Sequence, residues 1–195
     1  MADEKTGMKT TAIPLCDMIL GMLIIAQIPL MFGVVSGAAT VGVIPWVLMA
    51  YPMIIVCVVL MFKNGELIDA TINGVLSAVL MGQNAVTGTI YLVYTAAGQA
   101  IPAEVSAGMA LISAFAYLVG AIILIPIGWL AFHGTKVGGT CILCAGVGFL
   151  ALFFLYMGFG SLFGLIAAIG LQILAVYLLL TGISMLFPKK PAPQE

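Results

Sequence analysis

The chain has 195 residues, of which 64% are hydrophobic and only 7% are charged. A soluble domain usually carries about a quarter charged residues, so the surface of this protein could not face water. The net charge of −1, with six basic residues, all of them lysine, excludes the basic patch that a nucleic-acid-binding protein needs. The composition therefore predicts an integral membrane protein.

Six apolar segments are long enough to span a membrane, since a helix needs about 20 residues to cross the hydrocarbon core. Backbone polar groups in lipid must be paired within their own segment, so each span is expected to be a helix. The segments cover residues 13–35, 41–62, 68–95, 105–131, 138–159 and 162–187. We therefore expect an all-α protein with one six-helix transmembrane domain, residues 13–187, between short tails, residues 1–12 and 188–195.

The lysines indicate how the predicted helices are oriented. Basic residues are retained on the cytoplasmic side during insertion. With six spans, every lysine falls on one side, either in a tail or in the loops after the second and fourth spans. These residues are Lys5, Lys9, Lys63, Lys136, Lys189 and Lys190. We therefore expect both termini in the cytoplasm and a multi-pass protein of the cell membrane.

Two carboxyl groups fall within or beside the predicted spans. Asp17 lies in the first span, and Asp69 lies near the start of the third. An ionisable group inside a membrane is costly and usually serves a function. Ionised carboxylates would repel an anionic solute, so both residues are candidate proton-coupling groups.

Polar side chains form one line along the third span. At an advance of about 100° per residue, they fall within about 60° of Asn73. The line consists of Asp69, Asn73, Ser77, Asn84, Thr87 and Tyr91, interrupted near its middle by Leu76 and Leu80. An amide that faces lipid would cost on the order of several kcal/mol, so the line must face protein or water. It is either a contact between helices or the lining of a solute pathway, and its continuity favours the pathway.

Two later spans carry faces with fewer polar residues. In the fourth span, small residues share one face with Tyr117; they are Ser106, Ala110, Ser113 and Gly120. Such a face can line a narrow passage or let helices approach closely. In the sixth span, Tyr177 and Thr181 lie on one face and are added to the candidate pathway.

The sequence gives little support for catalysis or metal binding. Cys141 and Cys144 have C-x-x-C spacing, but no second pair follows, and on a helix they share one apolar face. The sequence has no nucleophile elbow, metalloprotease motif or phosphate loop. We therefore expect no enzyme, no metal and no cofactor.

Three short segments carry a resemblance to a known family. Residues 12–15, Ala-Ile-Pro-Leu, open the first span; residues 62–65, Phe-Lys-Asn-Gly, lead into the third; and residues 175–178, Ala-Val-Tyr-Leu, lie in the sixth. In order and spacing they resemble the N-P-A-P-L-G-L, aromatic-K-x-G and A-x-Y segments of the acetate uptake transporter family, the succinate–acetate permease group. With six spans and short tails, the resemblance extends over nearly the whole chain.

The resemblance implies a homohexamer in membrane lipid, with one pathway through each protomer. It also implies a hydrophobic constriction formed by the first, third and fifth spans. The matching positions are Leu20, Leu76 and Phe149, and Leu76 also interrupts the polar line.

We therefore expect a channel or transporter for acetate or a similar small monocarboxylate, with succinate as a further candidate. With no arginine present, neutral donors would hold the carboxylate loosely, which suits rapid release. The candidate pathway residues are Asn73, Ser77, Asn84, Thr87, Tyr91, Tyr177 and Thr181. Two alternatives stay open: a channel for a small neutral solute such as urea or a short amide, and an assembly protein whose polar line is only a helix contact.

Cysteine labelling tests the predicted orientation. Lys5→Cys and Ala192→Cys should react with an impermeant thiol reagent only after the cells are opened, because both tails are expected inside. Gln99→Cys, in a loop expected outside, should react in intact cells and serves as the positive control. Labelling of either tail in intact cells contradicts the six-span orientation.

Overall fold

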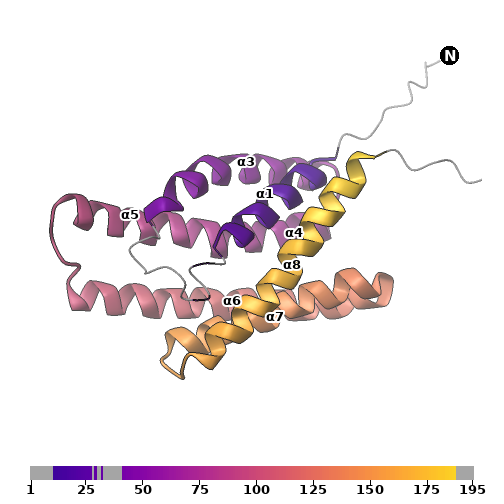
Figure 1. Ribbon diagram of the computed structural model, residues 1–195. Coiled ribbons are helices and arrows are strands. Elements are labelled where there is room, and N and C mark those ends of the chain that lie inside the picture. The colour runs from indigo at the N-terminus through magenta and orange to yellow at the C-terminus, as the bar shows by residue number, and fades with distance from the viewer. Residues whose placement is uncertain (1–10, 28, 30–31, 33–40, 188–195) are drawn as a thin grey trace, which may run out of the picture.

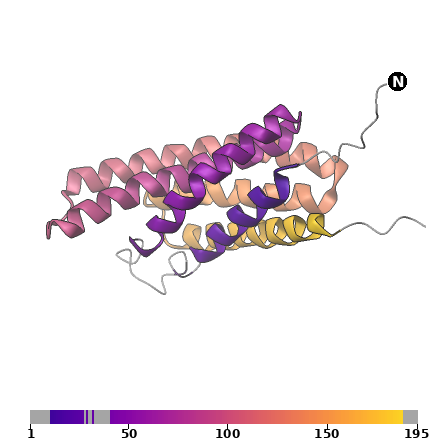
Figure 2. The same ribbon diagram turned by 90° about the horizontal axis from the view of Figure 1, so that it is seen from above.

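The computed structural model describes residues 11–27, 29, 32 and 41–187, and these residues form a bundle of helices (Figures 1 and 2). The elements are α1 (Ile13–Ala26), α3 (Ile44–Lys63), α4 (Leu67–Leu76), the π-helical segment η2 (Ser77–Gly82), α5 (Gln83–Ala96), α6 (Ala103–Gly134), α7 (Lys136–Tyr156) and α8 (Leu162–Leu186). Together α4, η2 and α5 make one continuous helix, Leu67–Ala96, called the third helix below. The predicted all-α architecture is confirmed for the described residues.

Five helices are long and apolar enough to cross a membrane: α3, the third helix, α6, α7 and α8. Their outward side chains are apolar, as a lipid-facing surface requires; Met49 on α3 is 77% exposed. The protein is therefore a multi-pass membrane protein. Helix α1 is shorter, with 14 residues. Most of residues 27–35, the remainder of the predicted first span, and nearly all of both tails lie outside the described residues, so a sixth crossing stays a prediction.

Successive helices run in opposite directions, so the connections fall at the two ends of the bundle. The α3–α4 and α6–α7 junctions lie at the end where α1 begins and α8 ends (Figures 1 and 2). Lys63 is the last residue of α3 and Lys136 is the first of α7, so both lysine-bearing junctions share that end. A first helix that begins and a last helix that ends at the same end of the bundle are what an even number of crossings would give. The membrane side on which this end lies stays a prediction.

Glycines allow α6, α7, α8 and α1 to pack with their backbones in contact. A Cβ built on Gly170 of α8 would lie 2.5 Å from the Cys144 carbonyl oxygen of α7. One built on Gly182 of α8 would lie 2.8 Å from the Pro14 carbonyl oxygen of α1, and one on Gly139 of α7 would lie 2.2 Å from a backbone nitrogen of α6. Small residues serve this purpose widely in membrane helices, because lipid supplies no hydrophobic force between them.

The third helix packs through side chains instead. On its α3 side, Gly82 lies under the Tyr51 ring and Gly88 lies under the Ile44 side chain. On its other side, Val79 lies close to the Phe149 side chain, near Gly120 of α6. Contacts made by side chains can adjust more readily than contacts between backbones. The third helix is therefore the more adaptable wall of the bundle.

The backbone contact between α7 and α8 predicts a sharp response to one methyl group. Gly170→Ala should lower stability by about 1–3 kcal/mol, because the new Cβ meets a backbone oxygen that cannot rotate away. Gly108→Ala, on α6, is the matched control: its Cβ would meet nothing within 4 Å, so stability should hold or rise slightly. Thermal unfolding in detergent measures both. Equal effects would mean that α7 and α8 are not in close contact.

Candidate functional site

The π-helical segment divides the predicted polar line into two groups. The Gln83 N–H donates to the Ala78 carbonyl, five residues earlier, whereas an α-helix bonds four residues back. The wider turn changes the angular advance, so α5 presents a different face from the one that a regular helix would give. The predicted line assumed about 100° per residue throughout. Asn73 before the segment and Asn84 after it nevertheless both donate to side chains of or beside α1.

The first polar group is buried between α1, α3 and α4. The Asn73 Nδ2 donates to the Asp17 Oδ1 at 3.3 Å and lies 4.0 Å from the Met61 Sδ. Asp17 is 5% exposed and Asn73 is 3% exposed. The Asn73 Oδ1 finds no partner among the described residues. A carboxyl group buried this deeply depends on the amide beside it.

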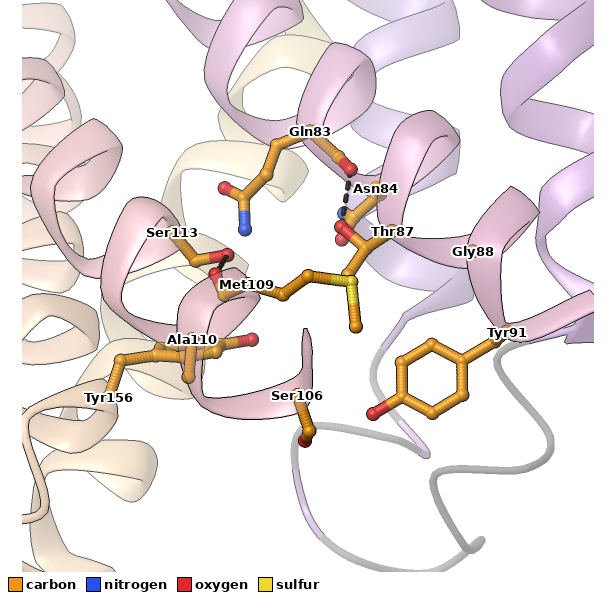
Figure 3. A pocket seen from close by; sticks show the side chains of 10 residues that line it. All are labelled: Gln83, Asn84, Thr87, Gly88, Tyr91, Ser106, Met109, Ala110, Ser113 and Tyr156. Carbon is orange, nitrogen blue, oxygen red and sulfur yellow. Dashed lines mark hydrogen bonds between the residues drawn. The ribbon is translucent and has the colours of Figure 1, made fainter. Parts of the chain in front are cut away.

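The second polar group lines a pocket between α5 and α6 with a volume of about 270 Å³ (Figure 3). Cavities that hold drug-sized ligands usually measure about 300–1,000 Å³, so this one suits a smaller solute. Its walls consist of Gln83, Asn84, Thr87, Gly88, Tyr91, Ser106, Met109, Ala110, Ser113 and Tyr156. None of these ten side chains carries a charge, so the pocket recognises a solute through neutral hydrogen bonds alone.

Several polar groups in the pocket already use their hydrogens within the protein. The Thr87 hydroxyl donates to the Gln83 carbonyl, and the Ser113 hydroxyl donates to the Met109 carbonyl. The Asn84 Nδ2 donates to the Leu80 carbonyl and to Gln27 Oε1 at the end of α1. These oxygens keep their lone pairs, and the Tyr91, Ser106 and Tyr156 hydroxyls add donors, so the pocket offers both acceptors and donors.

Aromatic rings connect the pocket to the apolar core. Tyr156 lines the pocket, and its ring centroid lies 5.5 Å from that of Tyr117, which is 3% exposed. The Tyr117 ring lies 5.7 Å from Phe149 in turn. Phe149 packs against Gly120, where a Cβ would lie only 2.5 Å from the ring. The position predicted for the constriction is therefore two ring contacts away from the pocket.

All three residues predicted for the constriction are completely buried. Leu20, Leu76 and Phe149 are each 0% exposed and belong to one hydrophobic core. They come from α1, α4 and α7. Completely buried side chains leave no open passage here, so the constriction stays a prediction.

The structure brings some of the predicted pathway residues together and separates others. Asn84, Thr87 and Tyr91 line the pocket, whereas Asn73 and Ser77 lie in the buried group near α1. Tyr177 and Thr181 do not line the pocket. The Tyr177 hydroxyl lies instead against Gly138 at the start of α7. Asp69 is exposed on α4, so it is not part of the buried pair.

Four further lining residues escaped the sequence prediction: Gln83, Gly88, Met109 and Tyr156. Gln83 stands one turn before Thr87 in α5, so the two share the face that lines the pocket. Ser106, Ala110 and Ser113 do share the face that the fourth span predicted. The face of small and polar residues in the fourth span was the sequence feature that indicated the α6 wall of the pocket.

The Asp17–Asn73 pair predicts a non-additive pair of substitutions. Asn73→Leu should lower stability by about 1–3 kcal/mol, because it removes the amide donor from a buried carboxyl group. Adding Asp17→Leu should restore most of that loss, since two apolar groups of similar size replace both partners. Detergent-solubilised protein and a denaturant titration give the four stabilities of the cycle. Simple addition of the two losses would contradict the pairing.

Comparisons with protein-family models, with curated proteins and with solved structures find no match. The resemblance to acetate uptake transporters therefore depends on its three segments alone. The structure shows in which helix or junction each segment lies. Residues 12–15 begin α1, residues 62–65 form the α3–α4 junction, and residues 175–178 lie within α8. The function is argued below from the pocket and the apolar layer beside it.

Proposed function

We propose that this protein is a channel or transporter that carries a small polar solute across a membrane, with acetate or a similar small monocarboxylate as the leading substrate. The observation that carries the proposal is a neutral, partly open pocket of about 270 Å³ between membrane-spanning helices. Uncharged polar groups lining a space between such helices suit a pathway for a small polar solute. Its small volume favours solutes of a few heavy atoms.

The three completely buried residues predicted for the constriction favour a pathway that moves the solute over a site that only holds it. A pathway that binds its solute weakly and then crosses a short dry constriction allows rapid movement without leakage of ions. Leu20, Leu76 and Phe149 would form this constriction. The resemblance adds the substrate class, a homohexameric assembly and the cell membrane as the location.

One observation favours a second solute class. The pocket offers acceptors as well as donors, whereas an ionised carboxylate accepts hydrogen bonds but cannot donate them. A small neutral solute that donates hydrogen bonds, such as urea or a short amide, matches these acceptors better. Flux into proteoliposomes, measured for acetate, succinate, formate and urea against protein-free liposomes, tests the proposal. No protein-dependent flux of any of the four would contradict it.

Two fully buried leucines test the constriction. Leu76→Ala should raise the flux of succinate relative to acetate several-fold, because it widens the apolar layer. Leu124→Ala on α6 is the matched control, since both side chains are 0% exposed. Each substitution should cost about 2–5 kcal/mol of stability, but only the first should change selectivity. An unchanged flux ratio in a folded Leu76→Ala protein would place the pathway elsewhere.

A further inference from the structure

The pocket lies at one end of the bundle rather than at its centre. On α6 its lining residues belong to the beginning of the helix, from Ser106 to Ser113, and on α7 it is lined by Tyr156, the last residue of that helix. Gly88, on the α5 wall, packs against Ile44, the first residue of α3. Three helix ends therefore place the pocket at one level, at the end opposite the lysine-bearing α3–α4 and α6–α7 junctions (Figures 1 and 2).

This level coincides with the expected surface of the membrane. Helix α3 has 20 residues and is about 30 Å long, which matches the thickness of a hydrocarbon core. Trp46, in the first turn of α3, is 63% exposed, and tryptophan is enriched where lipid meets water. The α5–α6 hairpin continues past the other helices at this end (Figures 1 and 2). The pocket therefore lies at the membrane–water boundary, at the base of a projecting hairpin.

The pocket is open toward this boundary and closed toward the centre of the bundle. At its outer rim, Ser106 is exposed and Tyr156 is 41% exposed. On its inner side, Tyr117 is 3% exposed and its ring contacts the Tyr156 ring. Phe149 and Leu76, which lie farther toward the lysine-bearing end, are completely buried. A solute can therefore reach the pocket from one side of the membrane in this structure.

We propose that the pocket is the entrance of the solute pathway, a vestibule that fills from the membrane side opposite the lysine-bearing junctions. It takes up small polar solutes from water through neutral hydrogen bonds. Passage farther into the bundle then requires the side chains of Leu76 and Phe149 to separate, so uptake into the pocket and crossing of the bundle are two different steps. This inference rests on the proposed transport function and assigns the pocket to one side of the membrane.

Cysteine reactivity in sealed vesicles of both orientations tests the side from which the pocket is reached. Thr87→Cys, on the α5 wall, should react with a charged, impermeant thiol reagent at least about 10-fold faster from the side that labels Gln99→Cys, because a thiol reacts as the thiolate, which forms in water. From the side that labels Lys63→Cys it should react no faster than the unmodified protein, whose four cysteines are buried or half-buried. Ser106→Cys, on the α6 wall, should behave in the same way and covers the case in which Thr87→Cys does not fold.

Solute flux shows whether the labelled pocket lies on the pathway. Labelled Thr87→Cys should lose most of its urea and acetate flux in proteoliposomes, compared with the same protein before labelling, since the attached group fills a pocket of about 270 Å³. Val86→Cys is the matched control: it neighbours Thr87 but is 64% exposed and lies outside the pocket, so labelling should leave its flux unchanged. Ser77→Cys, at a position that is 3% exposed, should not react from either side.

Two results overturn the inference while transport itself stands. The first is labelling of both pocket variants only from the Lys63→Cys side, or from neither side. The second is unchanged flux in fully labelled Thr87→Cys protein. If the unmodified protein carries neither urea nor acetate, and neither succinate nor formate, the transport function fails together with the inference.

Discussion

Every polar side chain inside this bundle needs a partner within the protein, because the surrounding lipid offers none. The hydroxyls of Thr87 and Ser113 meet this demand by donating to a carbonyl one turn earlier in their own helix. Asn73 meets it across helices by donating to Asp17. Most of the polar residues that stand out in the sequence are therefore engaged internally. The pocket differs because its hydroxyl and amide oxygens line a space of about 270 Å³ that a small solute can enter.

The third helix contributes to two polar environments along its length. Asn73, before the π-helical segment, donates to Asp17, and Asn84, after it, donates to Gln27 at the end of α1. The Ser77 hydroxyl donates to the Gly74 carbonyl at the beginning of the irregular turn, which competes with regular backbone bonding. Thr87, further along, lines the pocket against α6. One helix therefore provides a buried carboxyl–amide pair at one level and a neutral pocket at another.

Composition and periodicity predict the helices well, because length and hydropathy are properties of each segment alone. The predicted span 105–131, for example, lies within α6, Ala103–Gly134. The pocket depends on more. Asn84, Thr87 and Tyr91 were predicted from spacing, whereas Gln83, one turn before Thr87 on the same face of α5, was left out of the predicted line. Tyr177 shows the opposite error: its spacing on α8 is favourable, yet its hydroxyl packs at Gly138, because a polar face of a helix does not say which neighbour it meets.

The close packing of α6 against α7 bears on how the chain is assembled. Only Thr135 separates the two helices, and glycines at 128, 139 and 146 bring their backbones together along the hairpin. These contacts join residues that are near in sequence, and such local contacts form early in folding. The hairpin would then pair before α8 packs against α7. The α6 wall of the pocket would then form early, and the third helix and α8 would pack against it afterwards.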